Sequence, residues 1–99
     1  MTPADTLPTA LQSLGFSSYE ARAYAGLLSA YGQTAYALSK ATGVPQPKIY
    51  EALRKLQARG IAFQVGADPQ RFSATPPAEV LDKLRSDFQS RMDRAETAV

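Results

Sequence analysis

The chain has 99 residues, 44% of them hydrophobic, with a formal net charge of +2 and no His, Cys or Trp, which predicts one small domain with a packed core. Without Cys or His the sequence offers no disulfide, no zinc–thiolate site and no thiol or imidazole catalyst, so we expect no metal, no cofactor and no enzymatic activity. No stretch approaches the ~18 consecutive apolar residues of a membrane span, and the first twenty residues lack the basic start and apolar run of a signal peptide, so we expect a cytoplasmic protein that binds no membrane.

The N-terminal segment predicts a short helix over residues 7–14. Leu7, Leu11 and Leu14 recur at helical spacing and share one face, and Gly15 ends the helix. We therefore expect this face to pack on the core.

A second helix, of about fourteen residues, is predicted after Ser17. A hydroxyl at the N-cap followed three residues later by a carboxylate, here Glu20, is the capping-box pattern. Apolar side chains recur at helical spacing until Gly32 ends the helix. The side chains expected to pack are Tyr24, Leu27, Leu28 and Tyr31.

Thr34 is the predicted N-cap of a third, short helix over residues 35–41. The packing stripe of this helix is Ala37, Leu38 and Ala41. Gly43 supplies a left-handed C-cap and the residue before a proline is kept out of helical space, so residues 42–45 predict a tight turn.

The fourth predicted helix runs from Gln46 to about Arg59 and is ended by Gly60. Pro47 lies in its first turn, where the missing N–H is harmless. At 100° per residue the apolar positions fall on one face, and bases, an amide and an aromatic hydroxyl occupy the rest. The apolar positions are Ile49, Ala52, Leu53 and Leu56.

A β-hairpin is predicted next. Residues 61–65 alternate apolar and polar side chains as a half-buried strand does, and residues 71–74 return after a turn over residues 66–70. The hairpin side chains expected in the core are Phe63, Val65 and Phe72.

The last predicted helix, from Ala78 to the C-terminus, is longer than one small domain can cover, because about 22 residues extend ~33 Å. Its apolar residues are spaced 3, 4, 4, 3 and 4 apart and form a seam about 60° wide between charged side chains. These residues are Leu81, Leu84, Phe88, Met92, Ala95 and Val99. A second copy would cover the seam, so we expect a homodimer held by a coiled coil.

The order helix, short helix, tight turn, helix and hairpin is that of a winged helix-turn-helix. We expect a mainly α fold with a small β-hairpin, with the winged domain in residues 7–75 and the dimerisation helix in residues 76–99. Residues 21–72 carry seven bases and two acids, a net charge of +5, whereas both flanking segments are net negative. This asymmetry favours a polyanion partner, double-stranded DNA.

The helix over residues 46–59 is the predicted recognition helix for a major groove, and the hairpin over residues 61–74 is the predicted wing. The Gln46 amide suits adenine, and the Arg54 guanidinium suits guanine or a phosphate. Arg71 follows the wing turn and could reach an adjacent minor groove or its phosphates. Asp68 in the same turn weakens that electrostatic attraction. Contacts that position without specifying are expected from Lys48, Tyr50 and Lys55. The full set of candidate DNA-binding residues is Thr34, Gln46, Pro47, Lys48, Tyr50, Arg54, Lys55 and Arg71.

Three segments of the chain resemble the TrmB-like transcriptional regulators. Residues 11–24 (LQSLGFSSYEARAY) resemble the opening of that family, residues 43–56 (GVPQPKIYEALRKL) its recognition-helix segment, and residues 72–77 (FSATPP) its exit from the wing. The resemblance spans roughly residues 8–85 and implies a winged-helix DNA-binding domain in a dimeric transcription factor. The implied recognition residues are Gln46, Lys48, Tyr50 and Arg54.

Two features depart from that family pattern. Family members commonly carry a larger C-terminal sugar-sensing domain, and this chain ends before one begins, so sugar sensing is not implied. The sequence fits a short regulator and an N-terminal part of a longer one equally. Pro47 stands where the family more often has a small polar residue, which implies one fewer contact at the start of the recognition helix.

Two other functions remain open beside a sequence-specific regulator. Winged helices also serve as protein–protein assembly modules, and a chromatin-like protein coats DNA with weak specificity. The positive charge on the non-core faces of residues 46–59 favours DNA over the assembly module. The affinity ratio between a cognate site and random duplex separates the regulator from the coating protein.

Overall fold

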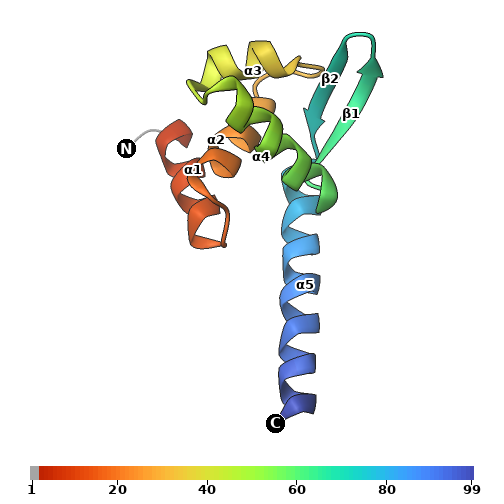
Figure 1. Ribbon diagram of the computed structural model, residues 1–99. Coiled ribbons are helices and arrows are strands. Elements are labelled where there is room, and N and C mark those ends of the chain that lie inside the picture. Colours follow the sequence, from red (N-terminus) through yellow and green to blue (C-terminus); the bar gives the residue numbers. More distant parts are fainter. Residues whose placement is uncertain (1–2) are drawn as a thin grey trace.

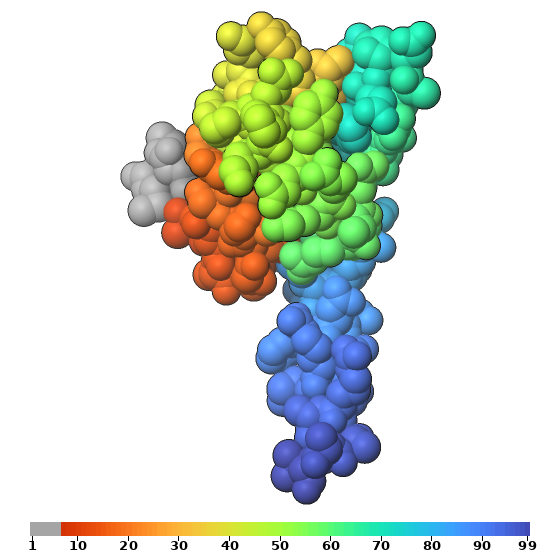
Figure 2. All heavy atoms as spheres, in the orientation of Figure 1, coloured from red at the N-terminus to blue at the C-terminus, as the bar shows by residue number. Residues whose placement is uncertain are grey.

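A computed structural model describes residues 3–99, with side chains from residue 7 onward. Helices and strands follow in the order α1 (Pro3–Ser13), α2 (Ser18–Leu27), α3 (Ala35–Thr42), α4 (Gln46–Ala58), β1 (Ala62–Ala67), β2 (Gln70–Ala74) and α5 (Pro77–Ala98). The first four helices and the hairpin form one body, and α5 projects away from it (Figures 1 and 2). The prediction of a mainly α winged helix-turn-helix with a long last helix is confirmed. No described helix is both long and apolar enough to cross a bilayer.

Local capping chemistry sets the starts and ends of the helices around the turn. The Ser17 hydroxyl accepts the Glu20 N–H at 3.1 Å and the Glu20 carboxylate accepts the Ser17 N–H at 2.8 Å, which confirms the capping box. The Thr34 hydroxyl accepts the Ala37 N–H at 3.1 Å. Gly43 has a φ of 75°, so it ends α3 in the left-handed conformation, and α4 begins three residues later.

The core lies under α4. All four predicted apolar positions of α4 are buried, as are Leu38 of α3 and Tyr24 and Leu27 of α2. This packing leaves the opposite face of α4 in solvent, which is the feature the site depends on.

One threonine joins the body to the start of α5. Thr75 donates from its N–H to the Ile61 carbonyl at 2.9 Å and from its hydroxyl to the Gly60 carbonyl at 2.8 Å. Its own carbonyl accepts the buried Tyr24 hydroxyl at 2.7 Å. We call this set of contacts the Thr75 junction. It ties α2, the end of α4 and the hairpin together at the residue where α5 is about to begin.

Stability is expected to fall at alkaline pH through Tyr24. Burial raises the pKa of the Tyr24 phenol from its ordinary 10.0 to about 12. Because the folded state keeps the phenol neutral to a higher pH than the unfolded chain does, this stabilisation is complete below pH 10 and is lost as the pH approaches 12. The free energy of unfolding should lose roughly 2–3 kcal/mol across that window.

Urea unfolding of Tyr24→Phe at neutral pH and at about pH 11 tests this expectation. The variant should be roughly 1–3 kcal/mol less stable at neutral pH, because the buried Thr75 carbonyl loses its donor, and its alkaline loss should be smaller than in the wild type. Tyr31→Phe is the matched control, since Tyr31 is 78% exposed. An equal alkaline loss in Tyr24→Phe and the wild type would contradict the assignment.

The wing is held to the helix-turn-helix by a third segment. β1 and β2 pair antiparallel, with a bulge between Gln64 and Gly66. Gln33 forms an isolated bridge with Phe72, with N–H to carbonyl distances of 2.9 and 2.7 Å. The hairpin is therefore fixed to the loop that leads into α3.

Helix boundaries before the turn differ from those expected. α1 begins at Pro3 rather than residue 7, and Leu14 follows its end and is exposed. α2 ends at Leu27, so Leu28 and Tyr31 lie outside it and are exposed. Beyond the end of α2 the Gln33 side-chain amide donates to the Gly26 and Ala30 carbonyls, in place of further helical bonds.

Two packing predictions are also wrong. In α3 the buried residues are Ala35 and Leu38, whereas Ala37 and Ala41 are exposed. In the hairpin Phe72 is buried but Phe63 is 41% exposed. Phe63 pairs with Ser73, and Ala62 pairs with Ala74. Ala62, Phe72 and Ser73 are buried, so the buried part of the hairpin does not follow the predicted alternation. Val65 lies at the bulge and is half-buried.

Candidate nucleic-acid interface

One flank of α4 carries two lysines that share an acid. The ammonium groups of Lys48 and Lys55 each lie 3.6 Å from a carboxylate oxygen of Glu51. All three side chains are exposed and border a shallow hollow that the start of α2 also lines, at Ser17 and Glu20. Such exposed pairs contribute little stability. A phosphate can therefore compete for either lysine.

The other flank of α4 carries an aromatic hydroxyl and an arginine. At 100° per residue Tyr50 and Arg54 lie across the outer face from the two lysines. Both side chains are exposed, and among the described residues the Arg54 guanidinium makes no hydrogen bond or ion pair. Its full set of donors is available to a partner.

The first turn of α4 has no side-chain cap. Its N-cap is Pro45, and Pro47 follows Gln46 in the first turn. The backbone N–H groups of Gln46 and Lys48 therefore point out of an uncapped helix start, where an anion is favourable. Sequence reasoning missed these donors, although two prolines flanking a helix start are the signal for them.

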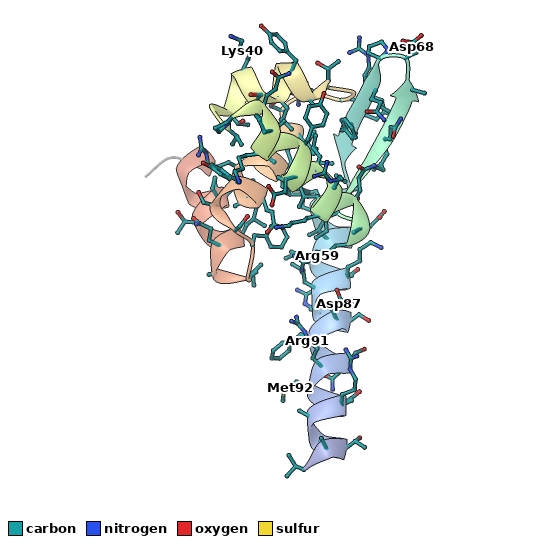
Figure 3. The ribbon with its side chains drawn as sticks, in the orientation of Figure 1. Lys40, Arg59, Asp68, Asp87, Arg91 and Met92 are labelled. Atoms are coloured by element: carbon teal, nitrogen blue, oxygen red, sulfur yellow. The ribbon has the colours of Figure 1, made fainter. Side chains whose placement is uncertain are left out.

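Helix α3 adds three residues to this surface: Thr34 at its N-cap, and Tyr36 and Lys40 on its exposed face. The Thr34 hydroxyl is engaged as the cap of α3. Tyr36 and Lys40 are exposed on the same helix, and the Lys40 ammonium lies 5.5 Å from the centroid of the Tyr36 ring. Lys40 lies at the end of the body away from α5, the same end as Asp68 at the wing tip (Figure 3). Sequence reasoning did not place Tyr36 or Lys40 in the site.

Some basic side chains near the turn make hydrogen bonds within the protein, whereas others are available to a partner. Arg71 is exposed, but its guanidinium donates to the Gly32 carbonyl at 3.0 Å, which holds it against the loop before α3 rather than at the wing tip. Arg22 donates to the Thr42 carbonyl and closes the C-terminal end of α3. The charge available to a partner is therefore concentrated on α4 and Lys40.

The apolar seam of α5 is largely uncovered. Val80, which sequence reasoning missed, is buried and Leu84 packs partly on the core. Phe88 is 60% and Met92 44% exposed, and Leu81, Ala95 and Val99 are exposed as well. An apolar groove of about 770 Å³ lies between α5 and the α1–α2 turn, and its apolar lining is Leu14, Leu81, Leu84, Phe88 and Met92.

Comparisons with known proteins agree with this fold. Residues 11–78 match the family profile described as the sugar-specific transcriptional regulator TrmB. The protein YrhO of Bacillus subtilis (strain 168) is 36% identical over 86 residues, which are 87% of this chain and 31% of that protein. The HTH-type sugar sensing transcriptional regulator TrmBL1 of Pyrococcus furiosus is 33% identical over 88 residues, which are 89% of this chain and 26% of that protein.

A solved structure of TrmBL2, an archaeal chromatin protein with a novel mode of DNA binding, has the same arrangement of elements. It superposes with a TM-score of 0.90 at 31% sequence identity, over 98% of this chain and 38% of that one. The chain thus spans about a third of the length of these relatives.

Proposed function

This chain belongs to the TrmB family of sugar-specific transcriptional regulators, and from that membership we propose that it binds double-stranded DNA at specific sequences and regulates transcription. The observation that carries the proposal is the outer face of α4, where three basic side chains and one tyrosine are exposed opposite a fully buried apolar stripe. These exposed residues are Lys48, Tyr50, Arg54 and Lys55. No step of this function needs a catalyst, a cofactor or a metal.

In the proposed complex α4 lies in the major groove, whose width of about 12 Å matches a helix with its side chains. Gln46 and Arg54 face base edges, adenine and guanine respectively. The other candidates, Thr34 and Pro47 at the two helix starts and Arg71 beside the wing, lie next to the backbone. Contacts to phosphates come from Lys48, Tyr50 and Lys55.

We further propose a homodimer built by pairing α5 with α5 of a second copy, with the winged domain in residues 7–75 and the dimerisation helix in residues 76–99. The uncovered seam supports it, since Phe88 and Met92 are otherwise left in water. Two-fold symmetry would present two α4 helices to one face of the duplex, about 34 Å apart. A DNA-bound regulator of this kind acts in the cytoplasm.

Weakly specific coating of DNA is the second candidate function. The likeness to the chromatin protein TrmBL2 over 98% of this chain favours it. Selection of bound duplexes from a random pool separates the two functions: a regulator enriches one motif and binds it at least about 10³-fold more tightly than random duplex. Enrichment without a motif would support coating instead, and the absence of any bound DNA would support an assembly module.

Two neighbouring basic side chains on α4, Arg54 and Lys55, should contribute differently to DNA binding. Arg54→Ala is expected to cost roughly 1–3 kcal/mol of binding free energy and to relax the preference at one base pair. Lys55→Ala should weaken selected and random duplexes by the same factor, because a phosphate contact carries no sequence information.

Competition titrations against single-position variants of the selected duplex measure both effects. Arg85→Ala on α5, which removes a base that is paired with Asp82 at 3.2 Å, is the control and should change neither quantity. If Arg54→Ala instead lowers the affinity for every duplex by the same factor, Arg54 does not recognise a base.

A further inference from the structure

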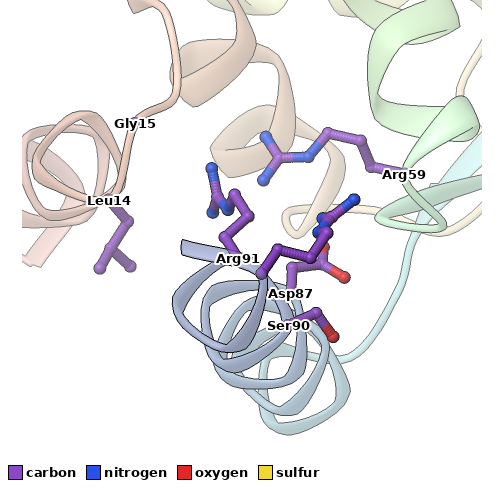
Figure 4. A pocket seen from close by; sticks show the side chains of 7 residues that line it. Leu14, Gly15, Arg59, Asp87, Ser90 and Arg91 are labelled. Atoms are coloured by element: carbon purple, nitrogen blue, oxygen red, sulfur yellow. The ribbon is translucent and has the colours of Figure 1, made fainter. Parts of the chain in front are cut away.

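Three arginines converge at the opposite end of the body from the wing tip. Arg59 forms the C-cap of α4, and Arg91 and Arg94 lie one turn apart on α5. Their side chains border a groove of about 400 Å³ whose floor includes Leu14 and Gly15 of the α1–α2 turn. Figure 4 shows Arg59 and Arg91 reaching into the same space from different helices. We call these three residues the arginine cluster.

We propose that the arginine cluster binds a small phosphate-bearing anion. A guanidinium presents a planar fork of donors that matches two phosphate oxygens at once. Three such forks, from two helices, border one open groove, and the Arg91 and Arg94 side chains are exposed there. The Ser90 hydroxyl, which lines the same groove, adds a further donor.

Arg59 is held in place before any ligand arrives. Its guanidinium carbon lies 4.9 Å from the centroid of the Phe16 ring, and Phe16 is itself buried in the core. Stacking on the ring face leaves the N–H edges of the guanidinium for the groove. Less side-chain freedom is lost when such a group binds an anion.

The charge of the cluster is not compensated within the part of the chain that the structure describes. The ion pairs found there join Lys48 and Lys55 to Glu51, and Arg85 to Asp82, and none involves the arginine cluster. Asp87 is the acid that lines this groove, so the lining keeps a net charge of +2. Like charges in one groove repel, and a dianion would relieve that repulsion.

The position of the cluster favours a free anion over the DNA backbone. Arg59 and Arg91 lie toward α5, whereas Lys40 and Asp68 mark the end of the body with α3 and the wing tip (Figure 3). Arg91 and Arg94 lie on α5, outside the outer face and first turn of α4 against which the duplex is proposed to lie. The anion instead links the end of α4 to α5 across the α1–α2 turn.

Isothermal titration of the whole 99-residue chain with inorganic pyrophosphate, at constant ionic strength and without DNA, tests the proposal. We expect saturable binding that Arg59→Gln and Arg94→Gln each weaken about tenfold, as the loss of a charge-assisted hydrogen bond does. Asp87→Asn should strengthen binding, because it removes the opposing charge. Arg85→Gln removes the same charge from α5 outside this groove and should leave binding unchanged.

Two results would overturn the proposal: no saturable binding of pyrophosphate, or an equal loss of binding in Arg85→Gln and Arg94→Gln. If pyrophosphate fails to bind and the arginine-cluster variants weaken duplex binding as Lys55→Ala does, the cluster belongs to the DNA-binding surface instead. Arg94 is exposed, so its variant keeps the test valid even where Arg59→Gln disturbs Phe16. A parallel titration with a hexose phosphate tests whether the cluster also recognises the rest of the ligand. Tighter binding of the hexose phosphate than of pyrophosphate would indicate a larger ligand, and equal or weaker binding would indicate recognition of the phosphate alone. Because no DNA is present, failure here leaves the proposed regulator intact.

Discussion

Replacing Phe88 by aspartate is expected to turn a dimer into a folded monomer and to lower DNA affinity about 10²- to 10⁴-fold, the usual loss when two linked sites become separate. Phe88 is 60% exposed on one chain, so the substitution costs the fold of the monomer little. In the paired state the same carboxylate would be buried without a partner, which is strongly unfavourable. Sedimentation equilibrium at tens of micromolar and a DNA titration measure the two effects.

Two further variants sharpen this expectation. Truncation after Arg85 keeps the buried Val80 and the partly buried Leu84, so it should give the same folded monomer. Gln89→Asp places the same charge one residue along, outside the seam, and should leave the dimer intact. A monomeric wild-type chain, or a dimer that survives both Phe88→Asp and the truncation, would remove α5 as the dimer interface.

Salt should weaken DNA binding steeply, with log affinity falling against log salt at a slope of about −5 to −7. The slope follows if Lys48, Arg54, Lys55 and Arg71 of two copies contact phosphates or bases, so that the dimer neutralises on the order of six to eight phosphates. Raising monovalent salt from about 50 to about 200 mM should then cost on the order of 10³-fold in affinity. Fluorescence anisotropy with a labelled duplex gives the slope directly.

Glu51 supplies an internal check on the salt experiment. Its carboxylate lies 3.6 Å from both lysine ammonium groups, and in the proposed complex it would also face the DNA phosphates. Glu51→Gln should therefore raise affinity at every salt concentration, whereas Asp82→Asn, which frees a base on α5, should not. A slope near zero at low ionic strength would reject DNA as the partner and favour the assembly module.

The parts of the fold that sequence predicted are those decided by local chemistry. The capping box at Ser17 and Glu20 and the left-handed Gly43 depend on residues within one helical turn of each other. The buried stripe of α4 follows from helical spacing alone. These signals place the helix-turn-helix without any long-range contact.

The parts that sequence missed depend on how the segments pack together. The Gln33 side chain folds back on the end of α2, and the Gln33 backbone pairs with Phe72 and so fixes the hairpin to the body. The exposed bases of α4 were named from the sequence. The sharing of Glu51 by two lysines, the contact from Arg71 to Gly32 and the arginine cluster all require the tertiary arrangement.

In the proposed dimer, the Thr75 junction would separate half-site spacing from base preference, which a regulator could otherwise change only together. Its three hydrogen bonds, followed by Pro76 and Pro77, fix the direction in which α5 leaves the body. In a dimer built on α5, a rotation of about 10° at this joint displaces the start of α4, about 20 Å away along that helix, by about 3.5 Å, which is about one base-pair step. In the proposed dimer, residues 75–77 would thus set the spacing between half-sites and the outer face of α4 would set the base preference. Evolution, or a protein engineer, can alter which bases are chosen without altering how far apart they stand.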